Sequence, residues 1–150
     1  MYHAIVRGIA RKNFERVNQN NFDALLADCA PNIRHQFGGN HAISGVRHDR
    51  EALSRWFGRL KRVLPNLNLS VTDVWVKGWP HNTTAIIRWE ALATLLNGSP
   101  YRNRGVHVIR LRWGKVVDID AHEDSQAVMN GLSIQAKHGV AEAAAEPILS

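Results

Sequence analysis

The feature that most constrains the fold is a change in hydrophobic spacing near Pro65. Before it, apolar residues recur at helical spacing, as at Leu53, Trp56 and Leu60. After it, apolar and polar residues alternate over 67–72, which is typical of strands with one buried face. Helices grouped ahead of strands predict an α+β fold rather than a parallel α/β sheet.

Turn and capping residues give the approximate bounds of the elements. The spacing predicts helices over 4–18, 22–29 and 50–64, a short strand over 33–37, a loop over 39–48, strands from 67, over 83–96, 106–113 and 116–122, and a last helix. Asp49 is placed to cap the third helix and Asp124 or Ser125 the last one, since their oxygens can accept from free first-turn amides. Residues 1–150 are interpreted as one domain, with 139–150 as a C-terminal tail.

Composition excludes several classes of protein. Hydrophobic residues make up 45% and charged residues 21%, as in ordinary globular domains. No run of eighteen apolar residues could span a membrane, and the N-terminus lacks the pattern of a secretory signal. Cys29 is the only cysteine, which fits a reducing compartment. We therefore expect a cytoplasmic protein without membrane partners.

The net charge of +6 raises the possibility of an anionic partner such as nucleic acid. The basic residues are spread around the third helix and the strands near the C-terminus: Arg47, Arg50, Arg55, Arg59, Lys61, Arg62, Arg102, Arg104, Arg110 and Arg112. They form no block of five like charges, and no nucleic-acid-binding motif is present. The expectation is a solvated basic surface and no nucleic acid, with an adaptor role kept as an alternative.

The two strands before the last helix carry a family resemblance. Gly105 to Arg112 leads into Gly114-Lys115-Val116-Val117 and ends at Asp124. This pattern and the order of elements resemble the nuclear transport factor 2-like superfamily, and within it the SnoaL-like polyketide cyclases. The resemblance implies a cone: N-terminal helices packed in a strongly curved antiparallel sheet, with a pocket for a small apolar molecule. It also implies a homodimer formed through the outer face of the sheet.

The superfamily includes isomerases, cyclases, epoxide hydrolases and binding proteins, so the fold leaves the chemistry open. Arg88 and Glu90 share one face of their predicted strand. They resemble the Arg-x-Asp element of limonene-epoxide-hydrolase-like members, which implies that both point into the cone. A buried carboxylate beside a guanidinium could transfer protons. The alternative is an exposed ion pair.

The last strand departs from the family pattern. Related hydrolases and cyclases carry an acid/base aspartate at the position that corresponds to Ala121. Asp118 and Asp120 lie nearby, but alternation points both to the opposite face, and only a β-bulge would turn Asp120 inward. Asp120 is therefore a conditional catalytic candidate.

Two histidines are the remaining candidates for proton transfer. His35 lies on the first short strand, where related hydrolases carry a pocket tyrosine, and could act as a base near neutral pH. His107 shares a face with Ile109 and Leu111 and is expected to face the apolar interior. The alternatives are an edge histidine for His35 and a hydrogen-bonded core histidine for His107.

The remaining lining of the predicted pocket is apolar. The candidate ligand contacts are Phe37, Trp56, Trp75, Ile109, Ile119 and Ala121. No His-x-x-x-His or Cys-x-x-Cys spacing indicates a metal, and no cofactor motif is present. The sequence thus predicts a small-molecule-binding protein, either an isomerase, cyclase or hydratase acting on an apolar cyclic compound or a noncatalytic binding or scaffolding dimer.

Overall fold

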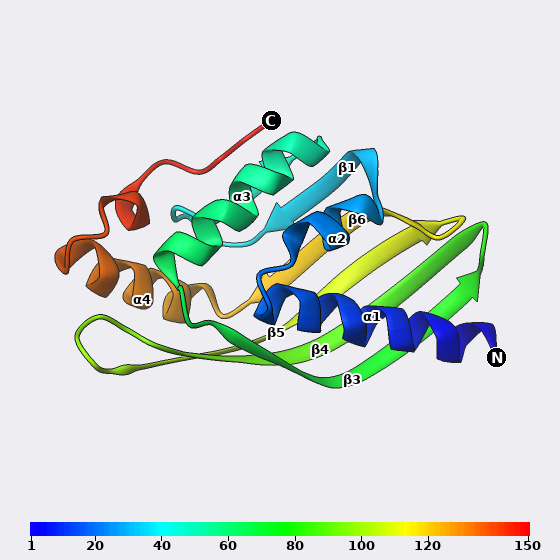
Figure 1. Ribbon diagram of the computed structural model, residues 1–150, viewed down its shortest axis with the longest axis horizontal. Coiled ribbons are helices and arrows are strands. Elements are labelled where there is room, and N and C mark those ends of the chain that lie inside the picture. The colour runs from blue at the N-terminus through cyan, green and yellow to red at the C-terminus, as the bar shows by residue number, and fades with distance from the viewer.

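All 150 residues are described by a computed structural model of the chain. The helices are α1 (Tyr2–Asn18), α2 (Phe22–Ala27), α3 (Arg50–Val63) and α4 (Ser125–Lys137), followed by the short 3-10 helix η1 (Ala141–Ala144). The first three helices cover one face of a curved sheet, and α4 lies at one end of the molecule (Figure 1). None of the helices is both long and apolar enough to span a membrane.

The sheet has six strands in the order β2-β1-β6-β5-β4-β3. They are β1 (Cys29–Phe37), β2 (Gly45–Arg47), β3 (Asn68–Trp79), β4 (Asn82–Thr94), β5 (Pro100–Arg112) and β6 (Lys115–Glu123). The strands after α3 pair antiparallel, as predicted, whereas β1 joins β6 in parallel. The α+β prediction is confirmed, and β2 is an addition inside the segment predicted as a loop.

Both predicted helix caps are present. The carboxylate of Asp49 accepts a hydrogen bond from the amide of Ala52 at 2.7 Å and begins α3. The carboxylate of Asp124 accepts from the amide of Ala127 at 3.2 Å and begins α4. These caps satisfy amides that have no partner within the helix and so define where each helix begins.

Two β-bulges decide which side chains face the helices. In β3 the register with β4 shifts between Val71 and Asp73, so Thr72 is an extra residue. In β6 the register with β5 shifts between Val116 and Asp118, so Val117 is an extra residue. Because strand side chains alternate, one extra residue moves every later side chain to the other face.

The C-terminal segment lies against α3 and β2. Arg59 and Arg62 of α3 contact the carboxylate of Glu142 at 3.1 and 2.5 Å. Further on, Arg47 donates to the carbonyl of Ile148 at 3.1 Å, and the amide of His48 donates to the hydroxyl of Ser150 at 2.7 Å. The predicted tail is therefore packed onto the molecule by ion pairs and main-chain hydrogen bonds.

Candidate functional site

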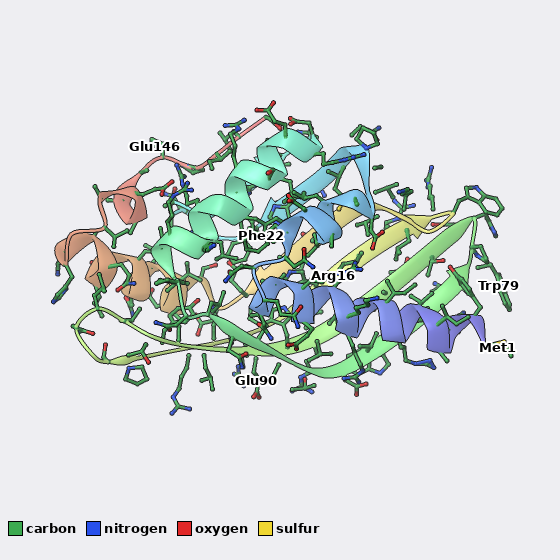
Figure 2. All side chains as sticks on the ribbon, viewed as in Figure 1. Met1, Arg16, Phe22, Trp79, Glu90 and Glu146 are labelled. Atoms are coloured by element: carbon green, nitrogen blue, oxygen red, sulfur yellow. The ribbon has the colours of Figure 1, made fainter.

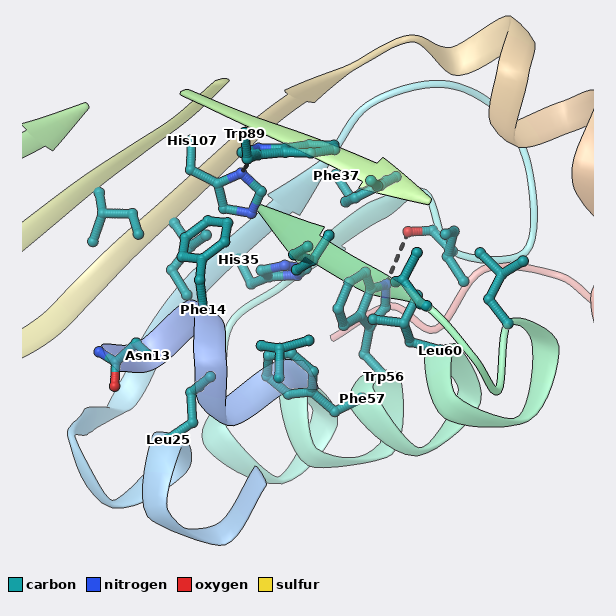
Figure 3. A pocket seen from close by; sticks show the side chains of 18 of the residues that line it. Asn13, Phe14, Leu25, His35, Phe37, Trp56, Phe57, Leu60, Trp89 and His107 are labelled. Carbon is teal, nitrogen blue, oxygen red and sulfur yellow. Dashed lines mark hydrogen bonds between the residues drawn. The ribbon is translucent and has the colours of Figure 1, made fainter. Parts of the chain in front are cut away.

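A cavity of about 110 Å³ lies between the helices and the concave face of the sheet (Figure 3). It is lined by 22 residues, of which 18 are hydrophobic. The four lining residues that are not hydrophobic are Asn13, His35, Asn103 and His107, and Tyr101 adds a hydroxyl. No charged side chain lines it. Such a cavity suits an apolar ligand oriented by a few hydrogen bonds.

His35 is fixed in the wall of the cavity by its neighbours in sequence and space. It is 2% exposed and faces inward with Phe37 because both alternate on β1. Its ring lies 4.5 Å from that of Trp56, whose indole donates to the carbonyl of Ile43 at 2.8 Å. The side chain of Arg47 donates through Nε to Nδ1 of His35 at 3.1 Å. The structure thus supports the pocket placement of His35, not a sheet-edge one.

Arg47 is a fully buried cation without a carboxylate partner. It is 0% exposed and donates to the carbonyls of Ser44, Gly45 and Ile148. Its guanidinium carbon lies 5.5 Å from the ring centre of Trp56, within the range of a cation–π contact. Burial lowers its pKa to about 10, so it stays charged at neutral pH. The expectation that Arg47 belongs to a solvated basic surface is wrong, because main-chain carbonyls replace its water.

His107 is held by one residue of β4 and one of α1. The indole of Trp89 on β4 donates to its Nδ1 at 2.7 Å, and the ring of Phe14 meets its ring edge-on at 5.2 Å. Gly105, paired with Trp89, leaves room for that indole: a Cβ at this position would come within 2.6 Å of it. Figure 3 shows the rings of His35 and His107 on the same side of the cavity.

The hydrogen bonds fix the protonation state of both histidines. A guanidinium and an indole N–H can only donate, so Nδ1 of His35 and of His107 must each accept. In a neutral imidazole the proton then lies on Nε2, which has no hydrogen-bond partner in the protein. In this arrangement neither ring has a free lone pair, so the geometry does not support the predicted role of His35 as a base.

Burial also keeps these rings neutral. It lowers the pKa of His35 well below its usual value, and the charge of Arg47 lowers it further. Burial lowers the pKa of His107 to about 4, with a smaller contribution from His122 that Asp120 partly opposes. At neutral pH the cavity therefore presents two uncharged N–H donors.

The other polar or titratable groups of the cavity have partners of their own. The amide of Asn103 donates to the hydroxyl of Tyr101 at 2.8 Å, and its oxygen accepts from the amides of Arg104 and Asp124. Burial raises the pKa of Tyr101 to about 12 and that of Cys29 to about 11. Neither side chain is ionised at neutral pH, so the lining contains no anionic group.

Arg88 and Glu90 do not face the cavity, and the prediction that they form its polar centre is wrong. Both are exposed on the outer face of β4, while Trp89 and Ala91 alternate inward and are buried. Figure 2 shows Glu90 pointing away from the helices. Turning an arginine and a glutamate inward would bury charges that nothing in the lining pairs.

The last strand likewise turns its acids outward. Asp120 makes an ion pair with His122 at 3.1 Å on the outer side, and Asp118 makes one with Arg34 at 3.0 Å. Ile119 lines the cavity, and Ala121 is 1% exposed behind its lining. A bulge does occur in this strand, at Val117, but it leaves Asp120 on the outer face.

Of the apolar residues predicted to contact a ligand, some line the cavity and others do not. Phe37, Trp56, Ile109 and Ile119 line the cavity. Trp75 does not: it is 48% exposed, because the bulge at Thr72 moves it to the outer face of β3. Two important residues were missed: Arg47, which no motif marks, and Trp89, whose place in the pattern Ile87, Trp89, Ala91 was the available signal.

A family comparison agrees with this architecture. The model of the SnoaL-like domain matches residues 10–119, most of the chain. The chain belongs to the SnoaL-like domain family. A comparison with curated protein sequences finds no match.

Solved structures with the same fold are similar over most of their length. A nuclear transport factor 2-like protein of unknown function from Burkholderia pseudomallei K96243 is 18% identical with a TM-score of 0.71, over 81% of this chain and 92% of that one. TerC, co-crystallised with polyporic acid, is 15% identical with a TM-score of 0.71, over 83% and 95%. A protein of the SnoaL-like polyketide cyclase type from Jannaschia sp. CCS1 is 19% identical with a TM-score of 0.64, over 83% and 90%. At these identities the likeness shows the fold alone.

Proposed function

We propose that this SnoaL-like protein binds a small, apolar, cyclic molecule in the cavity between the helices and the sheet. The observation that carries the proposal is a lining of 18 hydrophobic residues with two inward-facing histidines and no charged group. Burying apolar ligand surface against such a lining is favourable, and the few polar groups would orient the ligand. The fold neighbour TerC was co-crystallised with an organic compound, polyporic acid, which is consistent with ligand binding in this fold.

The cavity volume limits the part of a ligand that it can enclose. An engineered apolar cavity of about 150 Å³ in another protein takes up benzene. The volume of about 110 Å³ here is therefore suited to one small ring. A ligand with several rings would need side chains of the lining to move.

Reversible binding accounts for the site more fully than proton-transfer catalysis does. Isomerisation and cyclisation of carbonyl compounds require a base to remove a proton. The lining contains no carboxylate, and the free lone pairs of His35 and His107 are already used. The second candidate, an isomerase or cyclase, is favoured by one observation: two N–H donors could polarise a carbonyl, while water or a substrate group takes the proton.

Ligand titration followed by NMR tests the binding proposal. We expect ethylbenzene to shift the indole N–H signal of Trp56 in a saturable way. Ala91→Phe, which fills the cavity from β4, should abolish this response, and Leu92→Phe on the outer face of the same strand should leave it intact. Ala91→Leu serves as a milder replacement if the larger side chain prevents folding. No saturable shift in the wild-type protein would contradict ring binding in the cavity.

Catalysis has its own measurement. In D2O, an enzyme that removes a proton next to a carbonyl exchanges the methyl protons of bound acetophenone for deuterium. We expect no exchange above the uncatalysed rate, because no group of the lining can act as a base. Exchange that depends on the protein and is lost in His107→Asn would favour the isomerase or cyclase instead.

A further inference from the structure

The two histidines share an arrangement that neither the family nor the sequence pattern accounts for. Each imidazole is fixed at Nδ1 by a group that can only donate, Arg47 Nε for His35 and Trp89 Nε1 for His107. Each ring therefore presents its Nε2–H as the free polar group of a cavity wall. Two such donors in an apolar cavity form a site for oxygen atoms that accept hydrogen bonds.

We propose that the ligand is a ring compound carrying a carbonyl oxygen, recognised by Nε2–H of His35 and His107, and that Arg47 is the positioning residue that keeps His35 a donor. This inference rests on the proposed function and specifies its ligand class. Arg47 is not itself a lining residue: it lies behind His35 and Trp56, and its only hydrogen bond to a lining residue goes to His35.

The cavity offers a ligand hydrogen-bond donors but few acceptors. Nδ1 of both histidines accepts from the protein, and the side-chain oxygen of Asn103 accepts two backbone amides. The side-chain oxygen of Asn13 accepts from Arg16 at 2.9 Å. A ligand hydroxyl or amine would bring an N–H or O–H that finds few acceptors there, which is costly in an apolar site. A ketone or quinone oxygen brings only lone pairs and suits the two donors.

Arg47 strengthens this preference through its charge. It is buried without a carboxylate, and its four hydrogen bonds go to carbonyl oxygens and to His35. The hydrogen bond from a cation to Nδ1 polarises the imidazole and makes the opposite N–H a better donor. Arg47 therefore donates to His35, His35 would donate to the carbonyl oxygen, and the positive charge of Arg47 favours both hydrogen bonds.

Three probes of matched size test the ligand class in the intact protein. Acetophenone, 1-phenylethanol and ethylbenzene differ only in the group attached to the ring. We expect acetophenone to bind about tenfold more tightly than ethylbenzene, the ratio for about one net hydrogen bond, and more tightly than 1-phenylethanol. The infrared C=O stretch of bound acetophenone should lie at lower frequency than in hexane. Equal affinity of the ketone and the hydrocarbon, or an unshifted stretch, would overturn the inference.

Variants test the positioning role. Arg47→Met removes the donor to His35, and we expect the affinity ratio of acetophenone to ethylbenzene to fall to within about threefold and the infrared shift to shrink. Nitrogen-15 NMR should show the Nε2–H form of His35 in the wild-type protein and a mixture of tautomers in the variant. Arg62→Met, which removes an exposed guanidinium that contacts only Glu142 outside the cavity lining, is the matched control and should change neither.

A second variant keeps the test independent of the stability of Arg47→Met. Trp89→Phe retains the ring of the lining residue but removes the indole donor to His107. It should give a smaller infrared shift and a mixture of tautomers for His107, while His35 keeps its Nε2–H form. Unchanged tautomers and frequencies in every folded variant would overturn the role of these donors. The affinities of the probes also separate the two proposals. If ethylbenzene binds and acetophenone binds no more tightly, only the proposed ligand class is contradicted. If neither compound binds, the proposal of a ligand-binding cavity is contradicted.

Discussion

Single residues decide what the cavity can do. Glycine at position 105 allows the Trp89 indole to reach His107, and a buried arginine at position 47 holds His35. Both histidines are kept neutral by burial, and the lining contains no carboxylate that would favour their protonated forms. Their effect on the protein is therefore twofold: they supply donors to the cavity, and they make the folded state sensitive to acid.

The pH dependence of stability follows from the lowered pKa values. Histidines 35, 41 and 107 have lower pKa values in the folded protein than in the unfolded chain. Between pH 6.5 and about 4 the unfolded chain binds more protons than the folded protein, so the free energy of unfolding falls as the pH falls. The stabilising contribution of the neutral histidines is fully present above pH 6.5. For His107 alone, with a folded pKa of about 4, the loss from pH 7 to pH 5 is about 2 kcal/mol.

Urea unfolding at both pH values measures this change. His107→Asn cannot titrate in this range and should show a smaller loss of stability on acidification than the wild-type protein. Exposed His81→Asn is the control and should behave like the wild type. An identical pH dependence in His107→Asn would show that the ring is not held neutral in the folded protein. Glu123, whose pKa burial raises, acts in the opposite direction, but it is present in all three proteins.

At the scale of the elements, regular patterns were predictable and local irregularities were not. Helix α3 and its cap at Asp49 follow from spacing and side-chain chemistry. Alternation also groups the residues of each β4 face correctly, but the family resemblance assigned the wrong face to the cavity. The extra residue at Thr72 leaves no trace in the pattern, yet it moves Trp75 out of the cavity. Arg47 lies on a three-residue strand too short to show alternation, so its burial depends on contacts distant in sequence.

The turn between β5 and β6 contains a strained tryptophan. Trp113 has a φ of 51° and Gly114 one of 78°, and such two-residue turns favour Asn-Gly. Trp113 is 76% exposed, so it gains little by burial. We expect Trp113→Asn to raise the free energy of unfolding by about 1 kcal/mol, measured by urea denaturation.

A second exposed tryptophan provides the comparison. Trp79 is 63% exposed and lacks a positive φ, so Trp79→Asn should bring no gain in stability. If both substitutions stabilised the protein equally, removal of an exposed aromatic ring rather than relief of backbone strain would be the cause.

At the scale of the whole molecule, the convex face of the sheet is the surface left without a partner. Trp75, Ile86 and Val108 form a row across β3, β4 and β5, since Trp75 pairs with Ile86 and Ile86 with Val108. Trp75 and Ile86 are 48% and 36% exposed. Charges of both signs flank the row, including Arg88 opposite Asp73 and Arg110 opposite Asp118. A second copy of this chain could satisfy both the apolar row and the flanking charges.

We therefore expect a homodimer, in line with the family resemblance. Sedimentation velocity at tens of micromolar should give twice the mass of one chain, and Ile86→Lys should shift the protein toward the monomer. Arg7→Glu, at an exposed position of α1 on the other side of the sheet, should leave the dimer intact. A wild-type monomer at these concentrations would contradict the expectation.

The contacts of Arg47 have a practical consequence for handling the protein. The same guanidinium that donates to His35 also donates to the carbonyl of Ile148, and the next residues end in the hydrogen bonds of Ser150 to β2 and His48. We expect an affinity tag or reporter fused after Ser150 to weaken the hydrogen bonds of Ile148 and Ser150, and through Arg47 to change the position of His35 in the cavity wall. Fusions placed ahead of Met1, whose end of the molecule lies away from the junction in Figure 1, would spare the binding measurements.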